Sequence, residues 1–293
     1  MALKMLSIED MNITGKTVFV RVDMNTPIDP KTGKLMEFNR IKEASVTIRD
    51  LKKSKVVVAS HQGRVGRNDF ISLEQHAEAL ANFLGYEVKF VDDIFGPTAR
   101  KKIDSLSIGE VLLLDNLRLS AEENKEFIPK DAAKTMLVQR LYKLFDACVL
   151  DSFPTAHRSC PSIVGFSELL PSCGGRIVEK ELKALNKLLN VAKGIYATVL
   201  GGAKISDRLE AIDTLIANNR ADKVLLTGTV GNVFLKASGQ LDAKLGIDDE
   251  VKYVKQAKKL LTNHSDVFEM PKDVAIMSND SRVEVLIKEL KPN

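Results

Sequence analysis

The sequence predicts an α/β protein built from two parallel-sheet domains. Short apolar runs of strand type alternate along the chain with stretches that carry an amphipathic helical pattern. Runs such as Lys55–Ala59 are apolar almost throughout, which is typical of parallel strands covered by helices on both faces. A chain of 293 residues, 44% of them hydrophobic and 28% charged, is long enough for two domains with separate cores.

The first half of the chain carries the clearer pattern. The helix predicted at Ser72–Leu84 has an apolar stripe, a capping box formed by Ser72 and Gln75, and Gly85 as its C-terminal cap. The predicted strands are Thr17–Val22, Lys55–Ala59, Glu87–Val91, Val111–Leu114 and Asp146–Leu150, and the other predicted helices are Arg40–Lys53 and Asp131–Leu144.

The second half repeats this alternation after the paired glycines Gly174 and Gly175. We predict an N-terminal domain over residues 1–172, a connecting hinge helix within 173–190 and a second domain over 191–293. The predicted elements are the connecting helix Ile177–Leu189, strands at Ile195–Leu200, Lys223–Leu226 and Asp273–Met277, and helices at Ser206–Ala217, Val230–Ala237 and Glu250–Leu261.

Charge and cysteine content restrict the class of protein. The net charge of +4 fits scattered surface charge, a basic patch for anions or, less readily, nucleic-acid binding, since no run of five basic residues occurs. The cysteines, Cys148, Cys160 and Cys173, form no CxxC pair, so we expect reduced thiols and no zinc site. Because no apolar run approaches the roughly 20 residues of a membrane span, we expect a cytoplasmic protein.

Polar side chains follow four successive predicted strands, at the point where each strand ends. These segments are Asp23–Pro27, His61–Arg64, Asp115–Arg118 and Asp151–Arg158. Ligands of open parallel sheets bind outside the carboxyl ends of the strands. If the strands are neighbours, a set of arginines converges there: Arg21 or Arg40, Arg64, Arg118 and Arg158. The guanidinium fork suits carboxylate and phosphate, so the pattern predicts a site for a small molecule with several negative charges.

Each of these residues also has a purely structural interpretation. Arg40 could be an exposed residue at a helix start, and His61 could be a core histidine. Arg118 could pair with Glu122 on the surface, and Asp151 could cap the structure that follows its strand. The repetition at four strand ends favours the binding site over these separate explanations.

Two glycine-containing turns in the second half predict contacts with phosphate. The segment LGGAKISDR, Leu200–Arg208, combines a strand end, paired glycines and a lysine at a helix start. Glycines allow close approach of the backbone, and a helix N-terminus offers free N–H groups to an anion. It is not a Walker A pattern. The segment LLTGTVGN, Leu225–Asn232, is a second turn of this kind, although neither is specific alone.

Taken in order, the motifs resemble those of the phosphoglycerate kinase family from about Thr17 to the end of the chain: RVDMNTP, NRIKEA, SHQGRVG, DNLRLSAEE, DSFPTAHRS, EKEL and LGGAKISDR. Details such as HQGRVG and DDIFGPTAR resemble the archaeal branch. The resemblance implies a glycolytic and gluconeogenic phosphotransferase that interconverts 1,3-bisphosphoglycerate plus ADP with 3-phosphoglycerate plus ATP. It also implies two Rossmann-like, three-layer domains, the first for phosphoglycerate and the second for nucleotide with Mg²⁺.

The resemblance further implies roles for single residues. Arg40 would act at the carboxyl end of the substrate and, with Lys204, stabilise the transferred phosphoryl group. Arg208 stands where many family members carry a nucleotide-binding lysine, and Gly228 lies in the turn that packs against adenine. The residues implied in substrate binding are Asp23, Met24, Asn25, Arg40, His61, Gln62, Gly63, Arg64, Arg118 and Arg158.

Departures from the family pattern concern mainly the second domain. In the family this domain continues past the position of Asn293, with a glycine-rich loop whose aspartate meets magnesium and with a C-terminal helix. We therefore expect an incomplete second domain, an uncovered apolar sheet edge and no protein ligand for the metal in this chain. Thr227 and Thr229 replace a glycine run beside Gly228, which leaves the nucleotide preference open.

Three functions are compatible with these observations. The first is a phosphoglycerate kinase, active as it stands or when completed by a further C-terminal piece. The second is a protein that binds 3-phosphoglycerate without transferring a phosphoryl group, and the third is a nucleic-acid-binding protein. We favour the first, acting on small molecules as a monomer or homodimer without nucleic-acid or membrane partners, because the arginines follow separate strand ends and form no single stripe.

Overall fold

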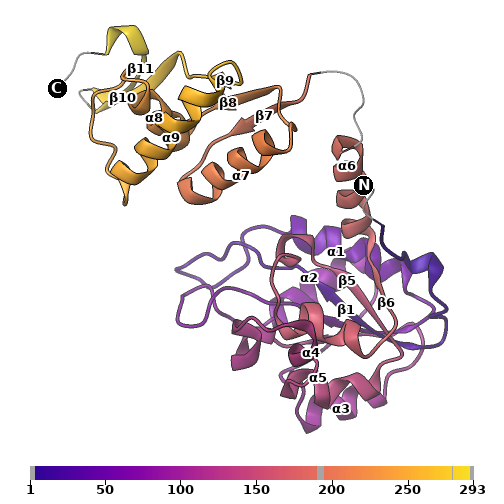
Figure 1. The fold of residues 1–293 in the computed structure, drawn as a ribbon. Helices are drawn as coiled ribbons and strands as arrows, with labels where there is room; N and C mark the ends of the chain where they lie inside the picture. The colour runs from indigo at the N-terminus through magenta and orange to yellow at the C-terminus, as the bar shows by residue number, and fades with distance from the viewer. Residues whose placement is uncertain (1–3, 190–194, 279, 291–293) are drawn as a thin grey trace. The chain divides into compact units, whose positions relative to one another are not determined.

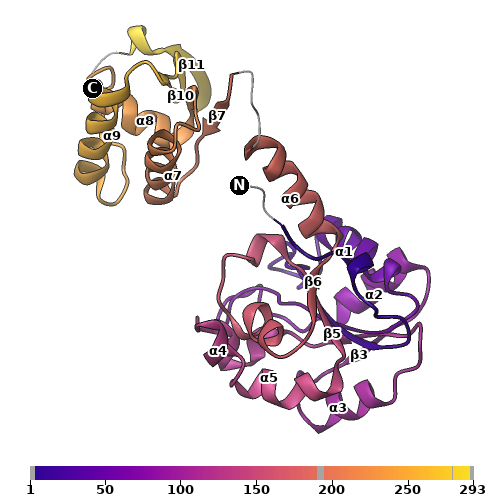
Figure 2. The ribbon, with the colours of Figure 1, turned by 45° about the vertical axis from the view of Figure 1, so that its right-hand side comes forward.

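The structure, a computed structural model, describes residues 4–189, 195–278 and 280–290, which fall into two compact units, Met1–Asn190 and Val191–Asn293. Both are of the α/β type (Figures 1 and 2). They are called the N-terminal unit and the C-terminal unit below.

The N-terminal unit is built on a six-stranded sheet in which every pairing is parallel. The strand order is β3-β4-β2-β1-β5-β6, so β1 lies inside the sheet and its neighbours are β2 and β5. The strands are β1 (Thr17–Val22), β2 (Lys55–Ala59), β3 (Val88–Val91), β4 (Val111–Leu114), β5 (Ala147–Asp151) and β6 (Ser172–Gly174).

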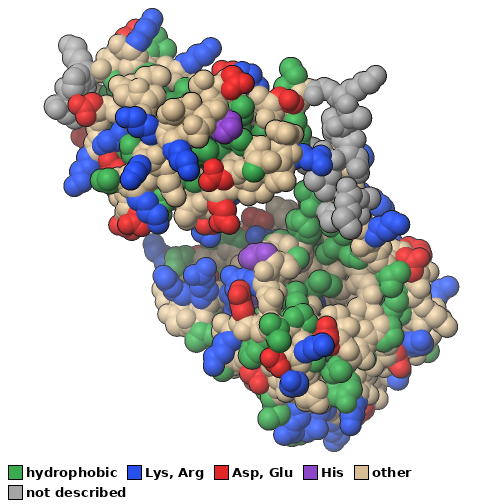
Figure 3. Space-filling model, viewed as in Figure 1, with side chains coloured by type: hydrophobic (Ala, Val, Ile, Leu, Met, Phe, Trp, Pro, Cys, Tyr) green, Lys and Arg blue, Asp and Glu red, His purple; other side chains and the backbone are tan. Residues whose placement is uncertain are grey.

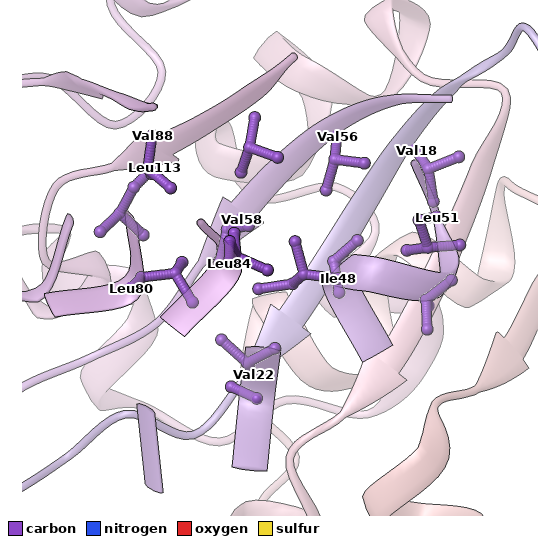
Figure 4. Packing of buried hydrophobic residues seen from close by; sticks show 14 of the residues in the cluster. Val18, Val22, Ile48, Leu51, Val56, Val58, Leu80, Leu84, Val88 and Leu113 are labelled. Carbon is purple, nitrogen blue, oxygen red and sulfur yellow. The ribbon is translucent and has the colours of Figure 1, made fainter. Parts of the chain in front are cut away.

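Helices cover both faces of this sheet, because successive side chains of a strand point to opposite faces. Val18, Val20 and Val22 of β1 face the core beneath α1 and α2, in which Figure 4 labels Val18 and Val22, while Phe19 faces the opposite core beneath α3 and α5. The helices are α1 (Asn39–Asp50), α2 (Glu74–Leu84), α3 (Pro97–Asp104), α4 (Pro129–Ala132), α5 (Met136–Leu141) and α6 (Arg176–Leu189).

The start of α2 differs from the prediction. Ser72 Oγ accepts a hydrogen bond from Glu74 N at 3.3 Å, but Gln75 does not complete a capping box. The Gln75 side chain instead donates to Gly33 O at 3.0 Å, which ties α2 to the loop before α1. The C-terminal cap is confirmed, because Gly85 has a left-handed backbone with φ of 82°.

The helix predicted over Asp131–Leu144 is wrong as a single element. The structure has α4 and α5, followed by a turn of 3₁₀ helix at Tyr142–Leu144. Thr135 Oγ1 donates to Ala132 O, and the Glu122 carboxylate accepts from Met136 N at 3.0 Å. These side-chain bonds offer the backbone an alternative to a continuous helix, so the chain turns between the two.

The C-terminal unit contains a three-stranded parallel sheet in the order β7-β8-β9 and a separate antiparallel hairpin, β10–β11. Its helices and the three-stranded sheet share one apolar core around Phe234 and Phe268. The edge strand β7 leaves Val199 66% exposed, so the described part of this sheet has an uncovered apolar edge. The elements are β7 (Ala197–Leu200), α7 (Ile205–Ala217), β8 (Lys223–Leu226), α8 (Gly228–Ala237), α9 (Glu250–His264), β9 (Phe268–Glu269), β10 (Asp273–Ser278) and β11 (Ser281–Leu286).

Candidate active site

The four predicted strand-end segments come together at the carboxyl edge of the N-terminal sheet. They line a cavity of about 780 Å³. Figure 3 shows a histidine and a group of Lys and Arg side chains gathered on one face of this unit. Eight of the predicted substrate-binding residues line the cavity: Asp23, Asn25, Arg40, His61, Gly63, Arg64, Arg118 and Arg158.

Two of the predicted substrate-binding residues, Met24 and Gln62, do not line the cavity. Met24 is fully buried in the core beneath α1 and α2. Gln62 is also fully buried, and its amide bonds Thr26 N at 2.9 Å, Thr26 O at 3.0 Å and His76 Nε2 at 3.2 Å. Gln62 therefore links the loop after β2 to the loop after β1 and does not line the cavity.

Asp23 holds the first loop and the start of α1 together. One of its oxygens accepts a hydrogen bond from Asn25 N at 3.0 Å, and the other accepts from Arg40 Nη1 at 2.7 Å. The carboxylate is nearly buried whereas the Arg40 side chain is 43% exposed. Asp23 thus fixes one N–H of the guanidinium and keeps Arg40 at the rim of the cavity.

Gly63 shapes the loop after β2. Its φ of +66° is left-handed, and a Cβ atom there would stand 2.2 Å from Asp69 O, so only glycine fits. Its N–H donates to Asn25 Oδ1 at 2.8 Å, and its carbonyl oxygen accepts from Arg118 Nη1. Side chains from two other strand ends therefore fix the position of this loop.

Arg118 and Asp151 do not have the structural partners considered from the sequence. Arg118 bonds the loop after β2, while Glu122 caps the start of α5. Asp151 does cap a helix, but it is α6: its Oδ1 accepts from Ile177 N at 2.8 Å. Burial raises the pKa of Asp151, although the bond from Thr47 on α1 opposes that rise.

The electrostatic environment of His61 is dominated by positive charge. His61 is 5% exposed, and burial together with the charges of Arg21, Arg118, Arg158 and Arg40 lowers its pKa to about 2. His61 is therefore a neutral imidazole at physiological pH. A neutral imidazole in an arginine-lined cavity can donate one N–H to a bound anion.

Acidification is expected to destabilise this unit through two buried histidines. His61 and His76 have pKa values of about 2 and about 4 in the folded protein, against about 6.5 in an unfolded chain. The unfolded state binds these protons first, so the free energy of unfolding should fall as the pH drops below about 6.5. The expected slope is about 1.4 kcal/mol per pH unit for each histidine.

Urea unfolding at a series of pH values between about 7.5 and 5 measures this slope, and a His76→Gln variant should show roughly half of it. Glutamine is the matched replacement because its amide can still donate to Gln62 Oε1, as His76 Nε2 does. An equal slope in the variant and the wild-type protein would contradict the assignment to His76.

Several lining residues were not among the individual site residues predicted from the sequence. Arg67, Asn68 and Asp69 come from the loop after β2, and Pro154, Thr155 and His157 come from the loop after β5. Arg67 lies only three residues after Arg64, so the length of that polar loop was a usable signal. With Arg67, five arginines line the cavity against two aspartates.

The two predicted phosphate turns lie next to each other at the carboxyl ends of β7 and β8, which pair in parallel. A Cβ atom on Gly201 would come within 2.8 Å of the Thr227 side chain, so the turns are in close contact. Lys204 is exposed at the N-terminus of α7, and Gly228 opens α8 with φ of +55°. Arg208 Nε donates to Gly201 O at 3.2 Å, which places its guanidinium beside the first turn.

The three cysteines, Cys148, Cys160 and Cys173, are free thiols, and all three are buried. Burial raises the pKa of their thiols to about 12, about 11 and about 12, respectively. Within the described ranges, no helix is long and apolar enough to cross a membrane, and no cluster of three or more metal-ligating side chains occurs.

A parallel α/β unit with an arginine-lined cavity at its strand ends, followed by a unit with two adjacent glycine turns at helix starts, defines a class: proteins that handle small phosphorylated molecules. The phosphoglycerate kinase family model matches residues 8–291. The chain belongs to the phosphoglycerate kinase family.

Relatives and solved structures agree with this membership. The chain is 42% identical over 300 residues to the phosphoglycerate kinase of Methanobacterium bryantii, covering 100% of this chain and 73% of that protein. It is 42% identical to the enzyme of Sulfurisphaera tokodaii, covering 97% and 72% of the two chains. The phosphoglycerate kinase structure from Pyrococcus horikoshii matches with a TM-score of 0.92 and 38% identity, covering 98% of this chain and 72% of that one. The predicted resemblance to archaeal phosphoglycerate kinases is confirmed.

Proposed function

We propose that the cavity of the N-terminal unit binds 3-phosphoglycerate or 1,3-bisphosphoglycerate for phosphoryl transfer. The observation that carries the proposal is the convergence of five arginines and His61 on one cavity that contains only two aspartates. One of those aspartates, Asp23, already pairs with Arg40. The remaining positive charge is complementary to a small molecule that carries both a phosphate and a carboxylate or acyl phosphate.

Within this proposal the side chains differ in role. Arg64, Arg118, Arg158 and His61 donate hydrogen bonds to the anionic groups of the substrate. Arg40, held at the rim by Asp23, orients the carboxyl end that gives or receives the phosphoryl group. Phosphoryl transfer depends on positioning and charge stabilisation more than on covalent help from the protein, and arginines supply both.

In the C-terminal unit, we assign the turns after β7 and β8 to the nucleotide. The starts of α7 and α8 offer backbone N–H groups to phosphates, and Lys204 and Arg208 add charge beside them. Lys204 would stabilise the transferring phosphoryl group, and Gly228 would allow close approach of the nucleotide. Mg²⁺ enters this proposal as part of the nucleotide substrate.

Replacing Arg64 by alanine tests the substrate site. The Arg64 residue is exposed, so its loss should leave the fold intact. A hydrogen bond to a charged group contributes about 1.5 to 3 kcal/mol, so the affinity for 3-phosphoglycerate should fall about 10- to 150-fold. Isothermal titration calorimetry with 3-phosphoglycerate measures this change.

The matched control is Arg140→Ala, which removes an exposed arginine of α5 that does not line the cavity. We expect its affinity to equal that of the wild-type protein. Unchanged binding by Arg64→Ala would show that the site is misplaced. A coupled assay of ADP formation from 3-phosphoglycerate and ATP tests transfer itself, and clear binding without turnover would favour the binding-only alternative.

A further inference from the structure

Behind His61 lies a chain of buried polar side chains that does not line the cavity. Arg21 is 2% exposed, Ser162 is 1% exposed and Glu123 is 6% exposed. Arg21 Nη2 lies 3.1 Å from His61 Nδ1, and Arg21 Nε donates to Ser162 Oγ at 2.8 Å. The Ser162 hydroxyl donates to Glu123 Oε1, while Glu123 Oε2 accepts from Ser162 N at 3.1 Å.

The donor and acceptor groups determine the direction of every hydrogen bond in this series of side chains. A guanidinium can only donate, and a carboxylate can only accept. The single hydroxyl proton of Ser162 goes to Glu123, so Ser162 Oγ accepts from Arg21. His61 Nδ1 must then accept from Arg21, which leaves the ring proton on Nε2. An imidazolium would set an N–H at Nδ1 against an N–H of Arg21.

The charge of Arg21 is held in place by Glu123, since Arg21 Nη2 and Glu123 Oε1 are 3.9 Å apart and both side chains are nearly buried. Removal of either partner alone would leave an uncompensated buried charge. The other charged groups that act on the ring are also cations, from α1, from the turn after β4 and from the segment after β5: Arg40, Arg118 and Arg158. The carboxylate of Asp23, which shares the cavity, is paired with Arg40.

We propose that Arg21, held by Glu123 through Ser162, keeps His61 neutral with its proton on Nε2, so that a bound anion meets a fixed N–H donor and its binding brings no proton onto the ring. An ordinary histidine beside a phosphate gains a higher pKa and takes up a proton on binding. Arg21 and Glu123 are positioning residues, because they act through His61. The proposal rests on the proposed function, since it takes the phosphoglycerate anion to bind in this cavity.

The protonation state of His61 can be observed directly. The chain has 4 histidines, so nitrogen-15-labelled histidine gives few imidazole signals, and a His61→Gln variant identifies those of His61. At about pH 6, where an ordinary histidine titrates, we expect the neutral Nε2–H signature with and without saturating 3-phosphoglycerate. An Nδ1–H signature or an imidazolium in the wild-type protein would overturn the proposal. The measurement without ligand decides this even if 3-phosphoglycerate fails to bind, an outcome that would count against the proposed function alone.

A double variant, Arg21→Met with Glu123→Gln, tests the two positioning residues. It removes both charges together, which avoids an unpaired buried ion. With 3-phosphoglycerate bound at about pH 6, we expect its His61 to show the imidazolium signature. Calorimetry in two buffers of different ionisation enthalpy should show about half a proton or more taken up per ligand beyond the wild-type value.

Cys160→Ala is the matched control, because Cys160 Sγ donates to Glu123 Oε1 at 3.3 Å without linking Arg21 to His61. Its His61 signals and proton uptake should equal those of the wild-type protein. A neutral His61 and wild-type proton uptake in the double variant would show that Arg21 and Glu123 do not set the state of the ring. If the double variant does not fold, the wild-type spectrum still decides the protonation state.

Discussion

Replacing Lys204 by alanine is expected to lower kcat for phosphoryl transfer about 100- to 1000-fold, the usual loss when one preorganised stabiliser of transition-state charge is removed. The effect should fall on kcat and leave KM for 3-phosphoglycerate little changed, because Lys204 lies in the C-terminal unit and the proposed phosphoglycerate site lies in the N-terminal one. The lysine is exposed at the start of α7, so its removal should not disturb the core.

The coupled assay measures both constants, with Lys259→Ala as the control. Lys259 is an exposed lysine of α9 in the same unit, and its replacement changes the net charge equally. A Lys204→Ala variant with the kcat of the wild-type protein would contradict the role assigned to the lysine. A reduced kcat in both variants would instead indicate a general effect of charge.

Replacing Phe19 by alanine is expected to lower the free energy of unfolding of the N-terminal unit by about 3 to 5 kcal/mol. Phe19 is fully buried on β1, and its ring centroid lies 4.3 Å from that of Phe166 and 5.2 Å from that of Phe145. The substitution leaves a cavity between the sheet and the segments that carry the other two rings, and it removes both aromatic contacts.

Urea unfolding followed by circular dichroism measures this loss, and hydrogen exchange of β1 assigns it to the N-terminal unit. Phe38→Ala is the control, because Phe38 is 44% exposed just before α1 and its loss should change stability by only about 0.5 kcal/mol. Equal stability losses in the two variants would show that the aromatic cluster contributes nothing beyond an exposed phenylalanine.

The sequence predicted every strand of four or more residues except β11, and it missed the two shortest strands, β6 and β9. Each of β1, β2, β4 and β5 is an apolar run that helices bury on both faces, so composition alone identifies it. The strands β6 and β9 have three and two residues, too few for a periodic signal. The strand β11, which alternates polar and apolar residues in an exposed hairpin, was not predicted. The helix α3 was not predicted either; it begins at Pro97, after Asp93 accepts a hydrogen bond from Gly96 N.

For the candidate site, the sequence predicted the segments but not the direction of each side chain. Successive residues of an extended segment point to opposite sides. Asp23 and Asn25 therefore reach the cavity, while Met24 between them enters the core. A contiguous motif does not reveal this alternation. The roles of individual residues, and the assignment of phosphoglycerate to one unit and nucleotide to the other, stay predictions until the variants are measured.

The sequence motifs could not predict the hydrogen-bonded connection between Glu123 and His61, for a different reason. Glu123 follows β4 and Ser162 follows β5, 39 residues apart in the chain, and both contact Arg21 of β1 in the folded protein. Spacing within a motif carries no information about such a contact. Only the tertiary structure shows that the Glu123 carboxylate, in the segment after β4, is connected with His61 in the loop after β2.

The buried state of Cys148, Cys160 and Cys173 has a practical consequence for spectroscopy. Alkylating reagents react with thiolates, and these thiols are both inaccessible and held protonated by their raised pKa values. We therefore expect that maleimide reagents do not label the native cysteines. A single cysteine introduced at an exposed position of each unit, such as Val65 beside the cavity and Val251 on α9, would carry a fluorophore pair without removal of any native cysteine.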